Sequence, residues 1–422
     1  MRPNSRRSRA PSAPVPDVER RESTDAARTA LARRVIFGCV IVAFLDGFDT
    51  QAIGPAIPAI AAQLGLEPDA MGSVLGASQI GFLIGAFLFG ALGDRFGRKR
   101  MLLLSTALFT VGTLATALSS SLPALLLSRV ITGLGLGGAS PNFISLVGEF
   151  ASPERRARTV TMLWAAVPLG GMVGAFATGQ IVPVYGWHAV FLIGAIAPVP
   201  VLAGVALLFP ESREAADVAA RPVGALFASD IRTTTLLLWI TSFLTWSTIV
   251  VTALWLPALL QRAGWSGPQA ATMLALNNGG GIIGTLVVGL LIGRGGAHRA
   301  LVATLIAACG LIALMGSLTS IVPAFAVLAI AAGCATSAAG GTLLAVSAGT
   351  YPPAARSTGV GWALGVGRTG TVLGPLAIGI MLGMGATVAT AFAAIAALAL
   401  LGVLTALLLM RASRSPAFRH GV

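Results

Sequence analysis

Long apolar runs alternate with short polar segments along almost the whole sequence. A helix needs roughly 20 apolar residues to cross the hydrocarbon core of a bilayer, and twelve runs are long enough. We expect membrane-spanning helices at 35–62, 71–93, 101–121, 122–148, 159–180, 188–210, 233–258, 268–293, 299–319, 322–349, 357–383 and 385–410. The pattern therefore predicts an all-α membrane protein with twelve transmembrane helices.

The composition agrees with this prediction. Of the 422 residues, 55% are hydrophobic and only 10% are charged, with a mean hydropathy of +0.86, whereas soluble domains carry about 25% charged residues. Residues 1–34 mix Arg, Ser, Pro and acidic residues without apolar periodicity, so we expect a disordered basic tail. The apolar run after it is too long for a cleaved signal peptide.

The positive charge lies almost entirely on one side of the predicted spans. The net charge of +13 raises the question of a nucleic-acid partner. However, 25 of the 28 Lys and Arg residues fall in segments that twelve crossings place on the same side as the N-terminus. These segments are the tail to Arg34, 95–100, 155–158, 213–232, 294–299, Arg356 and the tail from Arg411. The asymmetry predicts cytoplasmic termini in a bacterial inner membrane, with anionic lipid and not nucleic acid as the partner.

The chain repeats itself after about 200 residues. The segment 90–100, GALGDRFGRKR, follows the second run, and 289–299, GLLIGRGGAHR, follows the eighth. We expect two six-helix halves, as in transporters that work by rocking. The predicted domains are a tail 1–34, a first half 35–210, a cytoplasmic linker 211–232, a second half 233–410 and a tail 411–422.

Four segments resemble a known family. The segment 90–100 is similar to the signature loop of the major facilitator superfamily, and 46–54, DGFDTQAIG, resembles the first-helix motif of its aromatic acid:proton symporters. Residues 129–142 and 356–370 are similar to the fourth and eleventh helices of the same family. The resemblance covers about 33–410 and implies proton-coupled import of a hydroxybenzoate, protocatechuate or hydroxyphenylpropionate.

The chain departs from the family pattern at two places. The second signature loop has Gly293 where an acidic residue is usual and Ala297 where a basic one is usual. The tenth run carries only small residues at 337–341, where the family commonly has a Gln. The exact substrate is therefore less well determined than the family.

Two carboxylates interrupt the first apolar run. Asp46 and Asp49 are three residues apart, so they share one side of a helix. An acid at membrane depth is energetically unfavourable and usually functional. We expect the pair to carry the coupled proton, as the resemblance also implies; the alternative is that both only hydrogen-bond to neighbouring helices.

Arg129 and Arg368 are the only basic residues inside the predicted spans, with one in each half. A guanidinium binds a carboxylate through two parallel hydrogen bonds, so either residue is a candidate to hold the substrate. The alternative is a permanent ion pair with Asp46 or Asp49, or snorkelling of Arg129 to the surface. Further substrate-site candidates are the aromatic residues Phe48, Trp164 and Trp246 and the amides Gln51, Asn142, Asn277 and Asn278, although amides in spans also join helices.

The signature loop and its surroundings predict a gate. Asp94 is expected to pair with a basic residue across the gate and to stabilise one conformation. The predicted gating residues are Gly90, Asp94, Arg95, Gly97, Arg98, Glu149 and Arg356.

Other classes of protein fit the sequence less well. A drug:proton antiporter of the same fold is the main alternative, but its fifth-helix motif has only a partial counterpart at 168–171. A sensor would need a signalling domain that the short tails do not provide. The sequence has no ATP-binding loop, no nucleophile–base pair and no metal-ligand spacing, so we expect neither an enzyme nor a cofactor or metal. We expect the transporter to be a monomer.

Overall fold

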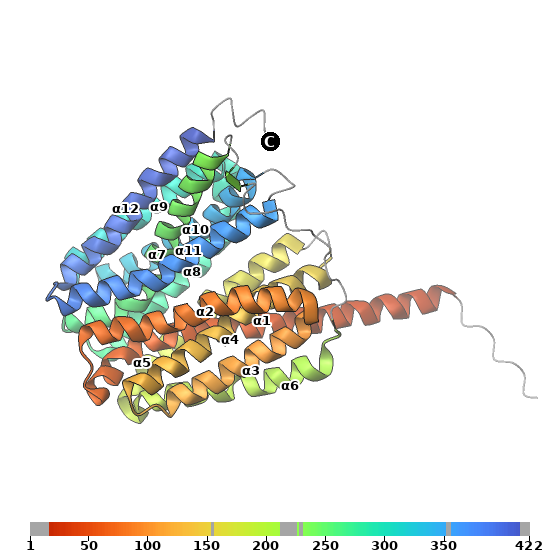
Figure 1. The fold of residues 1–422 in the computed structure, drawn as a ribbon, viewed down its shortest axis with the longest axis horizontal. Helices are drawn as coiled ribbons and strands as arrows, with labels where there is room; N and C mark the ends of the chain where they lie inside the picture. Colours follow the sequence, from red (N-terminus) through yellow and green to blue (C-terminus); the bar gives the residue numbers. More distant parts are fainter. Residues whose placement is uncertain (1–16, 153–155, 212–225, 228–230, 352–355, 414–422) are drawn as a thin grey trace, which may run out of the picture.

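The computed structural model describes residues 17–152, 156–211, 226–227, 231–351 and 356–413 (Figure 1). The helices are α1 (Asp17–Leu64), α2 (Pro68–Phe96), α3 (Arg98–Ala117), α4 (Leu122–Phe150), α5 (Arg156–Ile196), α6 (Pro198–Leu208), α7 (Arg232–Arg262), α8 (Gly267–Gly295), α9 (Ala297–Ser317), α10 (Val322–Thr350), α11 (Arg356–Gly383) and α12 (Val388–Ala412). Most of the predicted linker 211–232 and of the predicted tail 411–422 lies outside the described residues.

The all-α membrane fold predicted from the apolar runs is confirmed. Ten segments in the described part of the chain are long and apolar enough to cross a membrane. One of them, Met162–Leu208, is 47 residues long and contains the fifth and sixth predicted spans. The chain turns between these two spans at Gly186, where φ is +75°, a backbone conformation that glycine adopts without strain. The count of twelve spans holds only if α1 and both parts of this segment are included.

The predicted disordered tail is partly wrong. Helix α1 already begins at Asp17 and is 48 residues long, so residues 17–34 are helical. This stretch contains neither Gly nor Pro and is rich in Ala, Glu and Arg, which are strong helix formers. Being polar, these residues extend the helix as propensity favours, beyond the point where the apolar pattern begins. Residues 1–16 lie outside the described part.

The helices form two bundles (Figure 1). Helices α1–α6 form the first, in which α1 packs on α5 and α4 packs on α2 and α3. Helices α7–α12 form the second, in which α8 packs on α10, α7 on α11, and α9 on α12. The bundles meet mainly through α5 with α8 and through α2 with α11.

The bundles share a core at one end only. We call the end where α1 begins and α12 ends the tail end. Away from the tail end, a single apolar cluster joins both bundles and includes Ile57, Trp187, Trp255 and Phe392. At the tail end, the first bundle has its own core around Phe143 and the second has another. The two bundles therefore diverge toward the tail end, as Figure 1 shows.

Glycines allow the closest helix contacts. A methyl group at Gly133 or Gly137 on α4 would overlap a backbone carbonyl of α2, and one at Gly280 or Gly284 would overlap a carbonyl of α10. Small residues let the backbones approach in this way, as is usual in membrane bundles. The tight packing makes each bundle a stiff unit that can carry polar groups at fixed positions.

Candidate functional site

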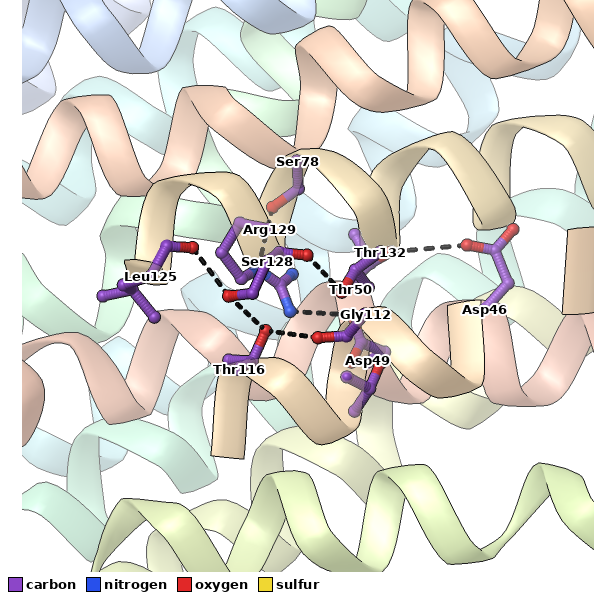
Figure 2. Close-up of polar contacts among 11 residues, drawn as sticks. Asp46, Asp49, Thr50, Ser78, Gly112, Thr116, Leu125, Ser128, Arg129 and Thr132 are labelled. Atoms are coloured by element: carbon purple, nitrogen blue, oxygen red, sulfur yellow. Dashed lines mark hydrogen bonds and ion pairs between the residues drawn. The ribbon is translucent and has the colours of Figure 1, made fainter. Parts of the chain in front are cut away.

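Arg129 and Asp49 form an ion pair inside the first bundle. The Arg129 Nη1 atom lies 3.1 Å from the Asp49 Oδ2 atom, and both side chains are fully buried. Arg129 Nε donates to Ser78 Oγ at 3.0 Å, and Thr113 Oγ1 donates to Asp49 Oδ1 at 3.0 Å. Figure 2 shows the pair enclosed among these helices. The network therefore ties α1, α2, α3 and α4 together.

The pair fits the structural alternative for these two residues. Arg129 also lies over the ring of Phe191, 5.7 Å from the ring centroid, and its Nη2 atom has no hydrogen-bond partner in the described structure. A buried guanidinium needs a compensating anion, and Asp49 supplies it. Neither residue faces the second bundle, so the structure does not bring them to the place where a rocking transporter binds its substrate.

Asp46 has different surroundings from Asp49. It is buried, with 6% of its surface exposed, and it accepts a hydrogen bond of 3.3 Å from Thr50 Oγ1 one turn further along α1. Figure 2 shows its carboxylate apart from the Asp49–Arg129 pair. The Arg368 guanidinium of the second bundle attracts this carboxylate across the interface, although the two do not form a direct ion pair. The two acids thus serve different bundle contacts.

Arg368 lies between two aromatic rings from opposite bundles. Its guanidinium carbon is 4.4 Å from the ring centroid of Phe82 on α2 and 4.6 Å from that of Trp246 on α7. The residue is half-buried, and no described residue accepts a hydrogen bond from it. Aromatic faces attract a cation but leave the planar N–H donors available. The sequence gave no sign of Phe82, because a Phe in an apolar run resembles any packing residue.

The four predicted amides have two different roles. Asn142 donates to the carbonyl oxygens of Gly138 and Phe89 at 2.8 and 3.2 Å, and Asn277 donates to that of Ala329 at 3.0 Å. Both amides thus join helices within one bundle. In contrast, Gln51 Nε2 on α1 donates to Asn278 Oδ1 on α8 at 3.5 Å, so this pair lies between the bundles.

The other predicted aromatic residues are less central. The edge of the Phe48 ring points toward Gly194, which keeps the ring inside the first bundle. Trp164 is half-buried on α5, and none of the described contacts links it to Arg368 or Asp46. Trp246 is the one predicted aromatic residue that the structure places against a buried charge of the interface.

The signature loop makes its contacts within the first bundle. Arg98 pairs with Glu149 at the end of α4 and, at 3.4 Å, with Asp94. Lys99 Nζ donates to the carbonyl oxygens of Ala206 and Phe209. The partner that the sequence predicted for Asp94 across the gate is therefore, in this conformation, a residue of the same loop. The Asp94 side chain is 63% exposed.

The remaining gating candidates are at the same tail end. Gly97 has φ +99° and separates α2 from α3, Gly90 faces Pro141, and Arg95 lies over the Phe96 ring at 5.2 Å. Arg356 begins α11, but its side chain is outside the described part. In the degraded second loop, a methyl group at Gly293 would meet nothing within 4 Å.

Comparisons with known proteins identify the family. A family model described as Major Facilitator Superfamily matches residues 39–322. The chain is 35% identical to the 3-(3-hydroxy-phenyl)propionate transporter of Escherichia coli, over 89% of this chain and 94% of the relative. It is 32% identical to the 4-hydroxybenzoate transporter PcaK of Pseudomonas aeruginosa, over 83% and 86%.

A solved structure supports the fold. The nucleoside transporter NupG matches with a TM-score of 0.76 at 14% identity, over 89% of this chain and 99% of that chain. Members of this superfamily are transporters, so the prediction of a transporter and not an enzyme is confirmed. The chain belongs to the major facilitator superfamily and, within it, to the family of the aromatic acid:proton symporters.

Proposed function

We propose that this chain imports an aromatic carboxylate together with a proton by alternating access. The observation that carries the proposal is Arg368, a cation between the rings of Phe82 and Trp246 with no anion bound to it. A carboxylate would bind its free N–H donors in a bidentate manner, and an aromatic ring would stack beside the two rings. The names of the relatives support an aromatic acid of the hydroxybenzoate, protocatechuate or hydroxyphenylpropionate type.

Asp46 is the proposed proton carrier. In the empty site the Arg368 cation attracts the Asp46 carboxylate. A substrate carboxylate on Arg368 takes over that attraction, which leaves Asp46 as an uncompensated acid in a buried site. Burial favours the neutral form of a carboxyl group, so Asp46 then takes up a proton. With substrate and proton bound, the site contains one charge pair and one neutral acid, and the net charge that must move through the membrane is lowered.

Asp49 is assigned a structural role in this proposal. Its carboxylate is compensated by Arg129 and Thr113, and neither partner changes when substrate binds between the bundles. Arg129 likewise holds the bundle together. The substrate and proton sites predicted for these two residues from the sequence are thus transferred to Arg368 and Asp46.

Transport requires the bundles to rock. The shared core away from the tail end closes that side, whereas the tail end has separate cores in each bundle. If the positively charged tail side lies in the cytoplasm of a bacterial inner membrane, this conformation faces inward. We propose that the Arg98 contacts with Asp94 and Glu149 stabilise it, and that a single copy of the chain transports. No observation favours efflux.

Uptake by the purified protein in liposomes tests the proposed function. An imposed inward proton gradient should drive accumulation of labelled 4-hydroxybenzoate in liposomes that contain the wild-type protein but not in protein-free ones. Arg368→Ala should abolish this accumulation, whereas Trp164→Phe, a change outside the proposed site, should preserve it. Accumulation by the Arg368→Ala variant at the wild-type level would refute the proposed site.

A further inference from the structure

We propose that Gln51 and Asn278 recognise a hydroxyl group on the aromatic ring of the substrate, so that the chain selects hydroxylated over unsubstituted aromatic acids. This inference rests on the proposed function and adds the part of the substrate that Arg368 does not read. The amide pair is the only side-chain hydrogen bond between the two bundles in the described structure.

The hydrogen bonds fix how the two amides point. Asn278 Nδ2 donates to the Leu274 carbonyl at 3.0 Å, which turns its Oδ1 atom toward Gln51. Gln51 must then donate with Nε2, as observed at 3.5 Å. The Gln51 Oε1 atom is left as an acceptor, and it is buried without a donor. A buried acceptor without a partner is unfavourable, so a donor is needed at this position.

A phenolic hydroxyl group supplies such a donor. Its O–H can donate to Gln51 Oε1, and its oxygen can accept from an amide N–H. Neither the carboxylate nor the ring of an aromatic acid can donate in this way. The unsatisfied atom therefore distinguishes hydroxylated acids from acids that lack the hydroxyl group.

The placement fits one molecule that spans both sites. Gln51 lies five residues after Asp46 on α1, which corresponds to about 7.5 Å along the helix axis, farther from the tail end. Arg368 acts on Asp46 and so marks the carboxylate end. A ring with a carboxylate at one end and a hydroxyl group at or near the other has a comparable length.

Gly171 on α5 leaves room for the amides. A methyl group there would be 2.7 Å from Gln51 Cγ and 2.8 Å from Asn278 Oδ1. Such distances are too short for carbon and oxygen atoms in contact, so only a glycine allows both amides this position. Three helices from both bundles thus build the polar position, and it forms only when the bundles come together.

Competition for transport tests the inference. Uptake of labelled 4-hydroxybenzoate is measured in the presence of unlabelled 4-hydroxybenzoate or benzoate, and the ratio of the two inhibition constants gives the hydroxyl preference. The wild type should prefer 4-hydroxybenzoate by about tenfold or more, because a site built to hydrogen-bond a hydroxyl group rejects the analogue without it. Gln51→Met, which keeps the length but removes the amide, should bring the ratio close to one.

Asn277→Leu is the matched control for Asn278→Leu, because Asn277 is the neighbouring amide but bonds only within its own bundle. The control should keep the hydroxyl preference, and Asn278→Leu should lose it; a ratio does not depend on how much protein folds. If the Gln51 and Asn278 variants weaken both acids equally, the amides only close the interface and the inference is wrong. A wild type that binds both acids equally also overturns it, while a wild type that takes up neither refutes the proposed function itself.

Discussion

Replacing Asp49 by Asn removes the anion from a pair in which both side chains are fully buried. Arg129 then keeps its charge in the bundle, with Ser78 as its remaining hydrogen-bond partner. Removing one partner of a buried ion pair costs about 3–5 kcal/mol, which corresponds to a factor of roughly 10² to 10³ or more in the folding equilibrium. We therefore expect Asp49→Asn to lower the thermal stability and the amount of protein in the membrane.

The assay is thermal unfolding in detergent, combined with the yield of folded protein. The double variant Asp49→Leu with Arg129→Met removes both charges and keeps similar volumes, so it should regain most of the stability, as apolar replacements of buried pairs often do. The reasoning is refuted if Asp49→Asn unfolds at the wild-type temperature yet loses proton-coupled uptake. Asp49 would then be a coupling residue, as the sequence pattern first predicted.

Three further predictions follow from the same contacts. Arg368→Lys should weaken binding of 4-hydroxybenzoate nearly as much as Arg368→Ala, since Lys lacks the planar fork; near-normal affinity of the Lys variant in a binding assay would contradict this. Glu149→Gln should reduce the maximal transport rate more than Asp94→Asn, with little change in substrate affinity, because the Arg98–Glu149 pair is buried and Asp94 is 63% exposed; equal rates would count against it. Gly280→Ala should destabilise the protein by about 1–3 kcal/mol, since its methyl group overlaps a carbonyl of α10, whereas Gly289→Ala, which meets nothing within 4 Å, should unfold like the wild type.

The apolar runs predicted most of the fold. Helices α7 to α12 begin and end within a few residues of the predicted spans, because apolar length is set by the bilayer. The polar start of α1 was missed, since helix propensity leaves no apolar pattern there. The joining of the fifth and sixth spans into α5 was missed as well, because nothing in the sequence marks Gly186 as a turn that continues the helical hydrogen bonding.

The candidate site was predicted as a set of residues but not as an arrangement. Intramembrane charges are rare enough to find Asp46, Asp49, Arg129 and Arg368 from the sequence. Sequence spacing places Asp46 and Asp49 on one side of a helix, yet it does not say that Asp49 meets Arg129 while Asp46 faces the other bundle. That division depends on how the helices pack. For the same reason, only the structure separates Asn278 from its neighbour Asn277.

Proton movement during substrate entry tests most directly whether Asp46 couples the two. Liposomes containing the wild-type protein and a pH-sensitive dye should become more acidic inside when 4-hydroxybenzoate is added outside, compared with protein-free liposomes. Asp46→Asn keeps the size and hydrogen bonding of the side chain but cannot carry a proton. We predict that this variant still lets labelled 4-hydroxybenzoate move down its own gradient, without protein-dependent acidification. Acidification in step with substrate entry by the Asp46→Asn variant would contradict the account.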